Sequence, residues 1–339
     1  MFFKFRGFVF YAALLFASSA QANCLAFTEN ERLANYCLFE TISGKLVDKN
    51  TAAVILQRLS LEGYFGGLTS ALSDFDITPS LYYSDNINGG NPNKKLRLGN
   101  LEFDGEQDLV AKAGTVVGLT LSGNSRFTYG EGRYLNTSVS ASFAYSPEHS
   151  LSYTQSNLQV CTKNKIRRNA HIDVCASANK QNKEISSSVE SYLTTSYSRM
   201  FINQYGATEV KMGLRKLSAQ DYQQNQLTLS SDLIHTNNGF YSLGLTLGER
   251  VKDQLTTLYV INVNAAKYYA GRKYNLSFTH GYSDGGKLLG VDRNERTNSL
   301  VISTAIHANT SISIGYANVR SSIDYFDRSY PIVSLTRSW

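Results

Sequence analysis

The chain has 339 residues and a formal net charge of +6, with 22 Tyr, 17 Phe and only 4 Pro. This mild, evenly spread charge excludes the concentrated basic surface that nucleic-acid binding requires. Apolar residues alternate with Ser, Thr, Asn and Gly along most of the sequence, whereas a soluble protein of this size should contain several continuous buried runs. The alternation is typical of a β-barrel with one face in lipid and a wet interior. A soluble β-sandwich or β-helix is the alternative.

Residues 1–22 have the composition of a secretory signal peptide. Lys4 and Arg6 form its positive start, residues 8–17 its apolar core, and residues 20–22 (Ala-Gln-Ala) its cleavage site. The apolar run is about ten residues long, whereas a membrane-spanning helix needs about twenty. An uncleaved anchor is the alternative. Cleavage would leave a mature chain with a net charge of +4, exported across the inner membrane of a Gram-negative cell.

Residues 23–75 are predicted to form a short helical segment. Thr28 and Glu31 have the spacing of a capping box at a helix start. A second helical run over residues 50–62 is expected to stop at Gly63. The sequence does not choose between a segment that hangs in the periplasm and one that plugs a barrel.

The four cysteines fall into two close pairs, Cys24 with Cys37 and Cys161 with Cys175. An even number at short spacing in an oxidising compartment favours disulfides between nearest neighbours. Metal binding is the alternative, but no His lies at ligand spacing beside either pair, and no metal or cofactor is predicted. The basic stretch 161–175 is expected to be a surface loop closed by its disulfide.

From Asp76 onward, strand signals recur at regular spacing, so residues 76–339 are predicted to form the barrel. The clearest pattern is residues 241–248, where Tyr and Leu alternate with Ser, Gly and Thr. At roughly 16 residues per strand and turn, residues 110–339 contain about 14 strands. Twelve is the alternative, because 161–185 could be one long loop. The predicted fold is all-β, a transmembrane antiparallel up-and-down barrel of 12–14 strands with a short N-terminal helical segment.

The last stretch, residues 328–339, has the pattern of a barrel's closing strand. Val333, Leu335 and Trp339 fall on one side of a period-2 pattern, and smaller residues fall on the other. A terminal strand that pairs with the first strand removes the open edge of the sheet. Many outer-membrane barrels end in such a strand with a C-terminal aromatic residue. We therefore expect Val333, Leu335 and Trp339 to act as the signal read by the barrel-assembly machinery.

No residue is predicted to be catalytic, and the protein is not expected to be an enzyme. A nucleophilic hydroxyl needs a positioned base that a third group orients. None of the five histidines is flanked by a G-x-S-x-G element or a comparable motif; they are His149, His171, His235, His280 and His307. Charged residues within strands, such as Arg199 and Arg215, are expected to line the lumen or the rims.

Two stretches are similar to the barrel of the surface lipoprotein assembly modifiers. The first runs from Tyr316 through Asn318 and Ile323 to Arg328, ahead of the terminal strand. The second is residues 79–88 (PSLYYSDNIN), which resembles the first strand and loop of that barrel. The resemblance implies a barrel that helps a client lipoprotein or secreted protein to reach the cell surface. The long helical-repeat domain of that family has no counterpart in residues 23–75.

Two functions follow as hypotheses. The first is translocation or surface display of a client protein. The alternative is a porin-like diffusion channel for small solutes, which the polar inner face of the predicted strands favours. An adhesin or structural barrel is a third class, suggested by the long polar linkers. The expected partners are outer-membrane lipid, the barrel-assembly machinery and, for the first hypothesis, the client.

Overall fold

The computed structural model describes residues 24, 29–43, 52–53, 56–57, 59–60, 63, 70–98, 100–307 and 309–338. The predicted signal peptide, Thr28, Trp339 and much of the second helical run lie outside these residues. No helix in the described part of the chain is both long and apolar enough to cross a bilayer.

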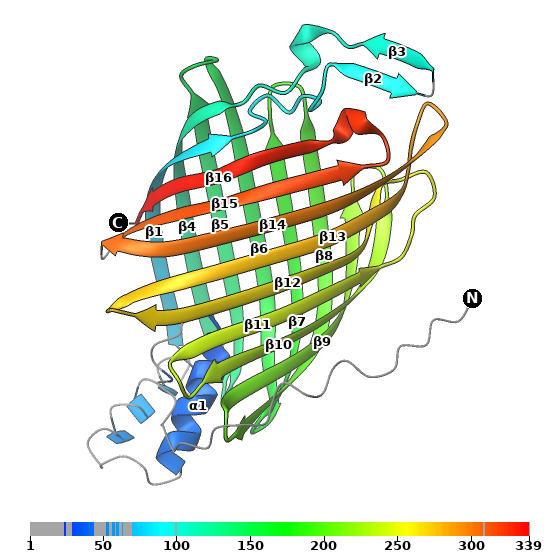
Figure 1. The fold of residues 1–339 in the computed structure, drawn as a ribbon. Helices are drawn as coiled ribbons and strands as arrows, with labels where there is room; N and C mark the ends of the chain where they lie inside the picture. The colour runs from blue at the N-terminus through cyan, green and yellow to red at the C-terminus, as the bar shows by residue number, and fades with distance from the viewer. Residues whose placement is uncertain are drawn as a thin grey trace.

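Fourteen antiparallel strands close into one barrel, which confirms the predicted fold class at its upper strand count (Figure 1). The helix α1 (Glu31–Ser43) precedes them, and β2 (Lys95–Leu98) and β3 (Leu101–Asp104) form a separate hairpin. The barrel strands are β1 (Ser70–Ser84), β4 (Gly114–Gly130), β5 (Arg133–Ser146), β6 (Leu151–Arg167), β7 (Ala170–Asn182), β8 (Ser187–Asn203), β9 (Gly206–Ala219), β10 (Gln223–His235), β11 (Gly239–Gly248), β12 (Thr256–Tyr269), β13 (Arg272–Leu288), β14 (Val291–His307), β15 (Thr310–Ser321) and β16 (Arg328–Arg337). Two short 3₁₀ helices, Gln107–Leu109 and Asp324–Phe326, lie in connections.

The barrel closes where β16 pairs with β1, as the terminal pattern predicted. Leu81 lies opposite Leu335, and Ser80 lies opposite Thr336. Val333 and Leu335 are 44% and 39% exposed on the outer face, whereas the side chains of Ser334 and Thr336 alternate toward the lumen. β1 begins at Ser70, ahead of the predicted barrel boundary at Asp76.

The outer face is apolar and the inner face is polar along the strands. On β11 the exposed side chains are Tyr241, Leu243 and Leu247, and Ser242 and Thr246 point the other way. With no water in the hydrocarbon core, a spanning sheet must satisfy all its backbone groups internally, which closure achieves. The closed ring and the apolar outer surface define an integral β-barrel of the Gram-negative outer membrane.

The two ends of the barrel differ in the length of their connections. At one end the strands are joined by tight turns such as residues 131–132, 168–169 and 270–271. At the other end the connections include residues 85–113 and 249–255. Outer-membrane barrels have short periplasmic turns and longer extracellular loops. The tight-turn end, where α1 lies in Figure 1, is therefore periplasmic.

The prediction of a surface loop over residues 161–175 is wrong. These residues form the ends of β6 and β7, and only Arg168 and Asn169 connect the two strands, at the periplasmic end. Cys161 and Cys175 are direct cross-strand partners, joined by a disulfide with Cα atoms 4.1 Å apart. The loop was predicted because the inward positions of these strands carry long charged side chains. Such side chains are as common in surface loops as on the wall of a water-filled lumen.

Candidate functional site: a plugged polar lumen

The helix α1 enters the periplasmic end of the barrel through its first turn. The Asn30 side chain caps the helix, since its Oδ1 accepts a hydrogen bond from the Leu33 backbone N–H at 3.0 Å. The same carboxamide donates to Glu209 at 2.6 Å and to Asp232 at 2.7 Å. Capping and wall contact therefore come from one residue, which fixes the helix start against β9 and β10.

Arg32 is the central charge of this contact. Its guanidinium donates two hydrogen bonds to Asp173 on β7, at 2.9 and 3.0 Å, and one to Glu209 on β9, at 2.5 Å. All three side chains are nearly inaccessible to solvent. Burial alone would lower the pKa of Arg32, but the charges of Glu209 and Asp173 outweigh it and raise the pKa above its usual value. Arg32 is therefore a permanent cation held between two buried carboxylates.

Further ion pairs join the helical segment to other sides of the lumen. Glu31 pairs with Arg126 on β4, and Glu29 pairs with Lys273 on β13. At the far end of the helix, Glu40 pairs with Arg168 of the β6–β7 turn at 2.8 Å. The acidic side chains of the segment meet basic wall residues, and its arginine meets acidic ones. These contacts place α1 against the inner face of the barrel wall, and we call it the plug.

An apolar cluster completes the contact between helix and wall. Leu33 and Leu38 of α1 are buried in it, and the Cys24–Cys37 disulfide lies within it, as predicted. The wall residues of the cluster are Met200, Ala207, Ile234, Phe240 and Ala266. Burial of a Leu or Ile side chain stabilises by about 1.5–3 kcal/mol, so this cluster holds the helix together with the ion pairs.

Beyond the plug, the inward-facing side chains are mostly small or neutral and polar. Most inward positions of this mid-lumen zone are uncharged. The inward charges Asp76 on β1, Lys211 on β9 and Asp232 on β10 lie opposite Ser122, Ser230 and Ser242. We name the following uncharged residues the polar belt: Ser138, Ser140, Ser142, Gln155, Asn157, Gln159, Ser177, Asn179, Thr228, Ser230, Ser242, Thr246, Asn262, Asn264, Ser277, Thr279, Ser299, Ser303, Ser311 and Ser313. Cross-strand hydrogen bonds within it include Thr279 to Asn262 at 2.9 Å and Ser303 to Ser313 at 2.8 Å.

The extracellular mouth is narrowed by the start of the loop that follows β1. Ile87 is fully buried against Val116 and Ala144, inside the wall of β4 and β5. The Ile185 backbone N–H donates to the Asn88 carbonyl at 3.0 Å, and Lys183 donates to the Asn86 carbonyl at 2.6 Å. Burial lowers the pKa of Lys183. The loop therefore crosses from β1 to the β7–β8 turn.

The same loop also contacts the opposite side of the mouth. The Asn93 carboxamide donates to the carbonyls of Asp324 and Asp327, both at 3.0 Å, in the connection before β16. In Figure 1 the β2–β3 hairpin extends above this side of the barrel. The lumen is thus restricted at the mouth by residues 85–93 and at the periplasmic end by α1, with the polar belt between them.

The sequence placed some of these residues correctly and missed others. The four cysteines form the two predicted disulfides, and Val333 and Leu335 face outward; their role as an assembly signal stays a prediction. The cluster of Arg32, Asp173 and Glu209 was not predicted. Its one sequence signal is a carboxylate at an inward position of β7 and of β9. Among the described residues, no group of His, Cys, Asp and Glu side chains is arranged to hold a metal ion.

No protein-family model and no curated protein matches this chain. Among solved structures, the chain is similar to OccAB2 of Acinetobacter baumannii, with a TM-score of 0.42 and 9% identity over 79% of this chain and 98% of that one. It is also similar to a BenF-like porin from Pseudomonas fluorescens Pf-5, with a TM-score of 0.42 and 9% identity over 81% and 99% of the two chains. A third similar structure is the outer membrane protein OprD from Pseudomonas aeruginosa, with a TM-score of 0.39 and 8% identity over 79% of this chain and 93% of that one. These values add no argument to the barrel fold described above.

Proposed function

We propose that this barrel is a diffusion channel for small, uncharged hydrophilic solutes, with its periplasmic end controlled by the α1 plug. The polar belt carries this proposal. A lumen wall made mainly of hydroxyl and carboxamide groups can replace the hydration of a polar solute by hydrogen bonds.

Several charges at both ends of the lumen are paired, which is compatible with a neutral solute. At the periplasmic end, Arg32 is balanced by Asp173 and Glu209. At the mouth, Arg293 pairs with Glu295, and Arg328 lies 3.5 Å from Asp85. Paired charges produce little net field along the lumen, so they neither concentrate nor exclude ions strongly.

The plug argues against a wide channel that is always open. A helix anchored by ion pairs to β4, β7, β9 and β13 occupies part of the cross-section. We therefore expect a small conductance in the resting state and larger flux when α1 shifts. Under this proposal the polar belt is the solute path and α1 is the element whose movement gates it.

Liposome swelling tests the proposal. Proteoliposomes of the purified full-length protein would be diluted into solutions of uncharged sugars of increasing size, and into gluconate and glucosamine salts as charged comparisons. We expect swelling with the small uncharged sugars and slower swelling with both charged solutes. Swelling no faster than in protein-free liposomes, for every solute, would refute the channel.

Export of a client protein rests only on the sequence resemblance at residues 79–88 and 316–328. Protease shaving of intact cells, with and without the protein, measures it independently of conductance. Loss of one or a few proteins from the surface at unchanged total abundance would support export. An unchanged surface set, combined with solute flux in liposomes, would leave the diffusion channel as the function.

A further inference from the structure

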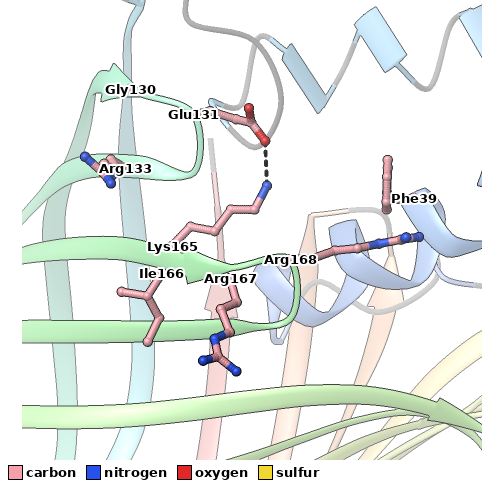
Figure 2. Close-up of a pocket in the computed structure, with 8 residues that line it drawn as sticks. All are labelled: Phe39, Gly130, Glu131, Arg133, Lys165, Ile166, Arg167 and Arg168. Carbon is pink, nitrogen blue, oxygen red and sulfur yellow. Dashed lines mark hydrogen bonds and ion pairs between the residues drawn. The ribbon is translucent and has the colours of Figure 1, made fainter.

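A basic pocket lies at the periplasmic rim, between two turns of the barrel wall and α1. It is formed by two neighbouring turns, with Gly130, Glu131 and Arg133 on one side and residues 165–168 on the other. Phe39 of α1 closes it from the plug side, and its volume is about 580 Å³ (Figure 2). None of the functions discussed above uses it.

Positive charge dominates the pocket lining. Four cations line it, Arg133, Lys165, Arg167 and Arg168, against the single carboxylate of Glu131. Lys165 pairs with Glu131 at 2.7 Å. Arg168 pairs with Glu40 of α1 at 2.8 Å and lies over the Phe39 ring at 4.8 Å. Two of the four cations are therefore already neutralised within the protein.

The other two cations, Arg133 and Arg167, are exposed and form no ion pair with a described residue. In Figure 2 their guanidinium groups point away from the Lys165–Glu131 pair. A guanidinium presents a planar fork of N–H donors that matches phosphate oxygens and binds them in a bidentate manner. The pocket therefore contains two guanidinium groups that have no anionic partner among the described residues.

The position of the pocket relative to the membrane indicates a lipid head group as the source of that anion. Phe127 and Tyr129 are about half exposed on the outer face of β4, immediately before the turn that forms the pocket. Aromatic side chains at this position form the interfacial girdle of a membrane barrel, at the level of the lipid head groups. Ile166, a pocket residue, is 49% exposed on the outer side of β6 and offers an apolar surface for an acyl chain.

We propose that this pocket binds the phosphate group of an anionic phospholipid of the inner leaflet. The guanidinium groups of Arg133 and Arg167 point in different directions in Figure 2, and these exposed side chains would turn toward each other to hold the phosphate. The acyl chains would run along Ile166 toward the apolar outer face. Because Arg168 and Phe39 connect the pocket to α1, the bound lipid would also stabilise the seated plug. The proposal does not depend on the channel function.

The test is lipid retention measured by native mass spectrometry of the full-length protein from nanodiscs. The nanodiscs would contain equal amounts of phosphatidylglycerol and phosphatidylcholine. The variant is Arg133→Ala with Arg167→Ala. The matched control is Arg272→Ala, which removes an exposed arginine at the same end of the barrel, in the β12–β13 turn region. Heat-modifiable migration of each variant confirms that its barrel has folded.

We expect the double variant to bind phosphatidylglycerol about thirtyfold more weakly, because it lacks two basic side chains that attract anionic lipid at the membrane surface. The Arg272→Ala protein should retain the lipid like the wild type. Equal retention by the double variant would overturn the proposal, as would an equal loss in Arg272→Ala, which would indicate a diffuse basic rim. Competition by inorganic phosphate without any preference between the two lipids would assign the pocket to a soluble phosphate compound and overturn the lipid assignment.

Discussion

Arg32 and Asp173 are separated by 141 positions in the sequence, yet the Arg32 Nη1 lies 2.9 Å from the Asp173 Oδ1 inside the barrel. The contact joins the one described helix of the plug to a strand of the wall. Glu209 accepts from the other nitrogen of the same guanidinium. One cation is therefore shared between carboxylates on two strands. A second cation, Lys211, lies 3.5 Å from Asp173.

Arg32→Met should release the plug while leaving the barrel folded. The substitution leaves Asp173 and Glu209 buried without their main partner, and breaking a buried ion pair in this way costs about 3–5 kcal/mol. The strand ladders do not involve Arg32, so heat-modifiable migration should be unchanged. We expect a larger, noisier conductance in planar bilayers and faster cleavage of the N-terminal segment by protease.

Two further variants check the cause of this effect. Arg97→Met removes an arginine of the exposed β2–β3 hairpin, which pairs with Glu102 far from the plug, and it should conduct like the wild type. Combining Arg32→Met with Asp173→Asn and Glu209→Gln removes the unpaired charges and should restore much of the low conductance. If Arg32→Met alone keeps the wild-type conductance, the charge cluster does not hold the plug.

The barrel was predictable from the sequence and the plug contacts were not, for a physical reason. Alternation is a local property, so residues 241–248 reveal their strand without any knowledge of their neighbours. The seat of Arg32 depends on carboxylates that β7 and β9 bring together only in the closed barrel. The same difference explains residues 161–175, whose polar inward side chains have no lipid-facing signature of their own and were interpreted as a loop.

Asn157→Asp should make the channel prefer cations. Asn157 is an inward residue of the polar belt on β6, opposite Asn179 on β7. A carboxylate there acts on a passing ion through water, where a unit charge at 4 Å contributes about 1 kcal/mol, or about a fivefold change in the permeability ratio. The reversal potential in a salt gradient measures this ratio. Asn157→Gln, which keeps the wall neutral, is the control, and an equal shift in both variants would contradict the polar belt as the ion path.

Ile87→Ala should loosen the loop at the mouth. Ile87 is fully buried in a small cluster with Val116 and Ala144, and truncating a buried Ile costs about 2–5 kcal/mol. Since the loop is anchored locally, we expect the loss to appear as loop mobility and as swelling with larger sugars. Leu101→Ala, in the exposed β2–β3 hairpin of the same connection, should leave the size limit unchanged. An unaltered size limit in Ile87→Ala would mean that the loop does not restrict the mouth.

Val333→Arg should impair insertion of the barrel, whereas Ser334→Arg should be tolerated. The two residues are neighbours on the closing strand β16, but Val333 faces outward and Ser334 faces the lumen. An arginine on the lipid face costs about 2–4 kcal/mol near the middle of the bilayer, and in a wet lumen it remains hydrated.

Deletion of Trp339, which lies outside the described residues, should also reduce assembly if the terminal strand is the signal read by the assembly machinery. The fraction of heat-modifiable protein in outer-membrane preparations measures all three variants. Equal levels for Val333→Arg and Ser334→Arg would contradict the assigned faces of β16, and full assembly without Trp339 would refute the signal while leaving the strand register intact.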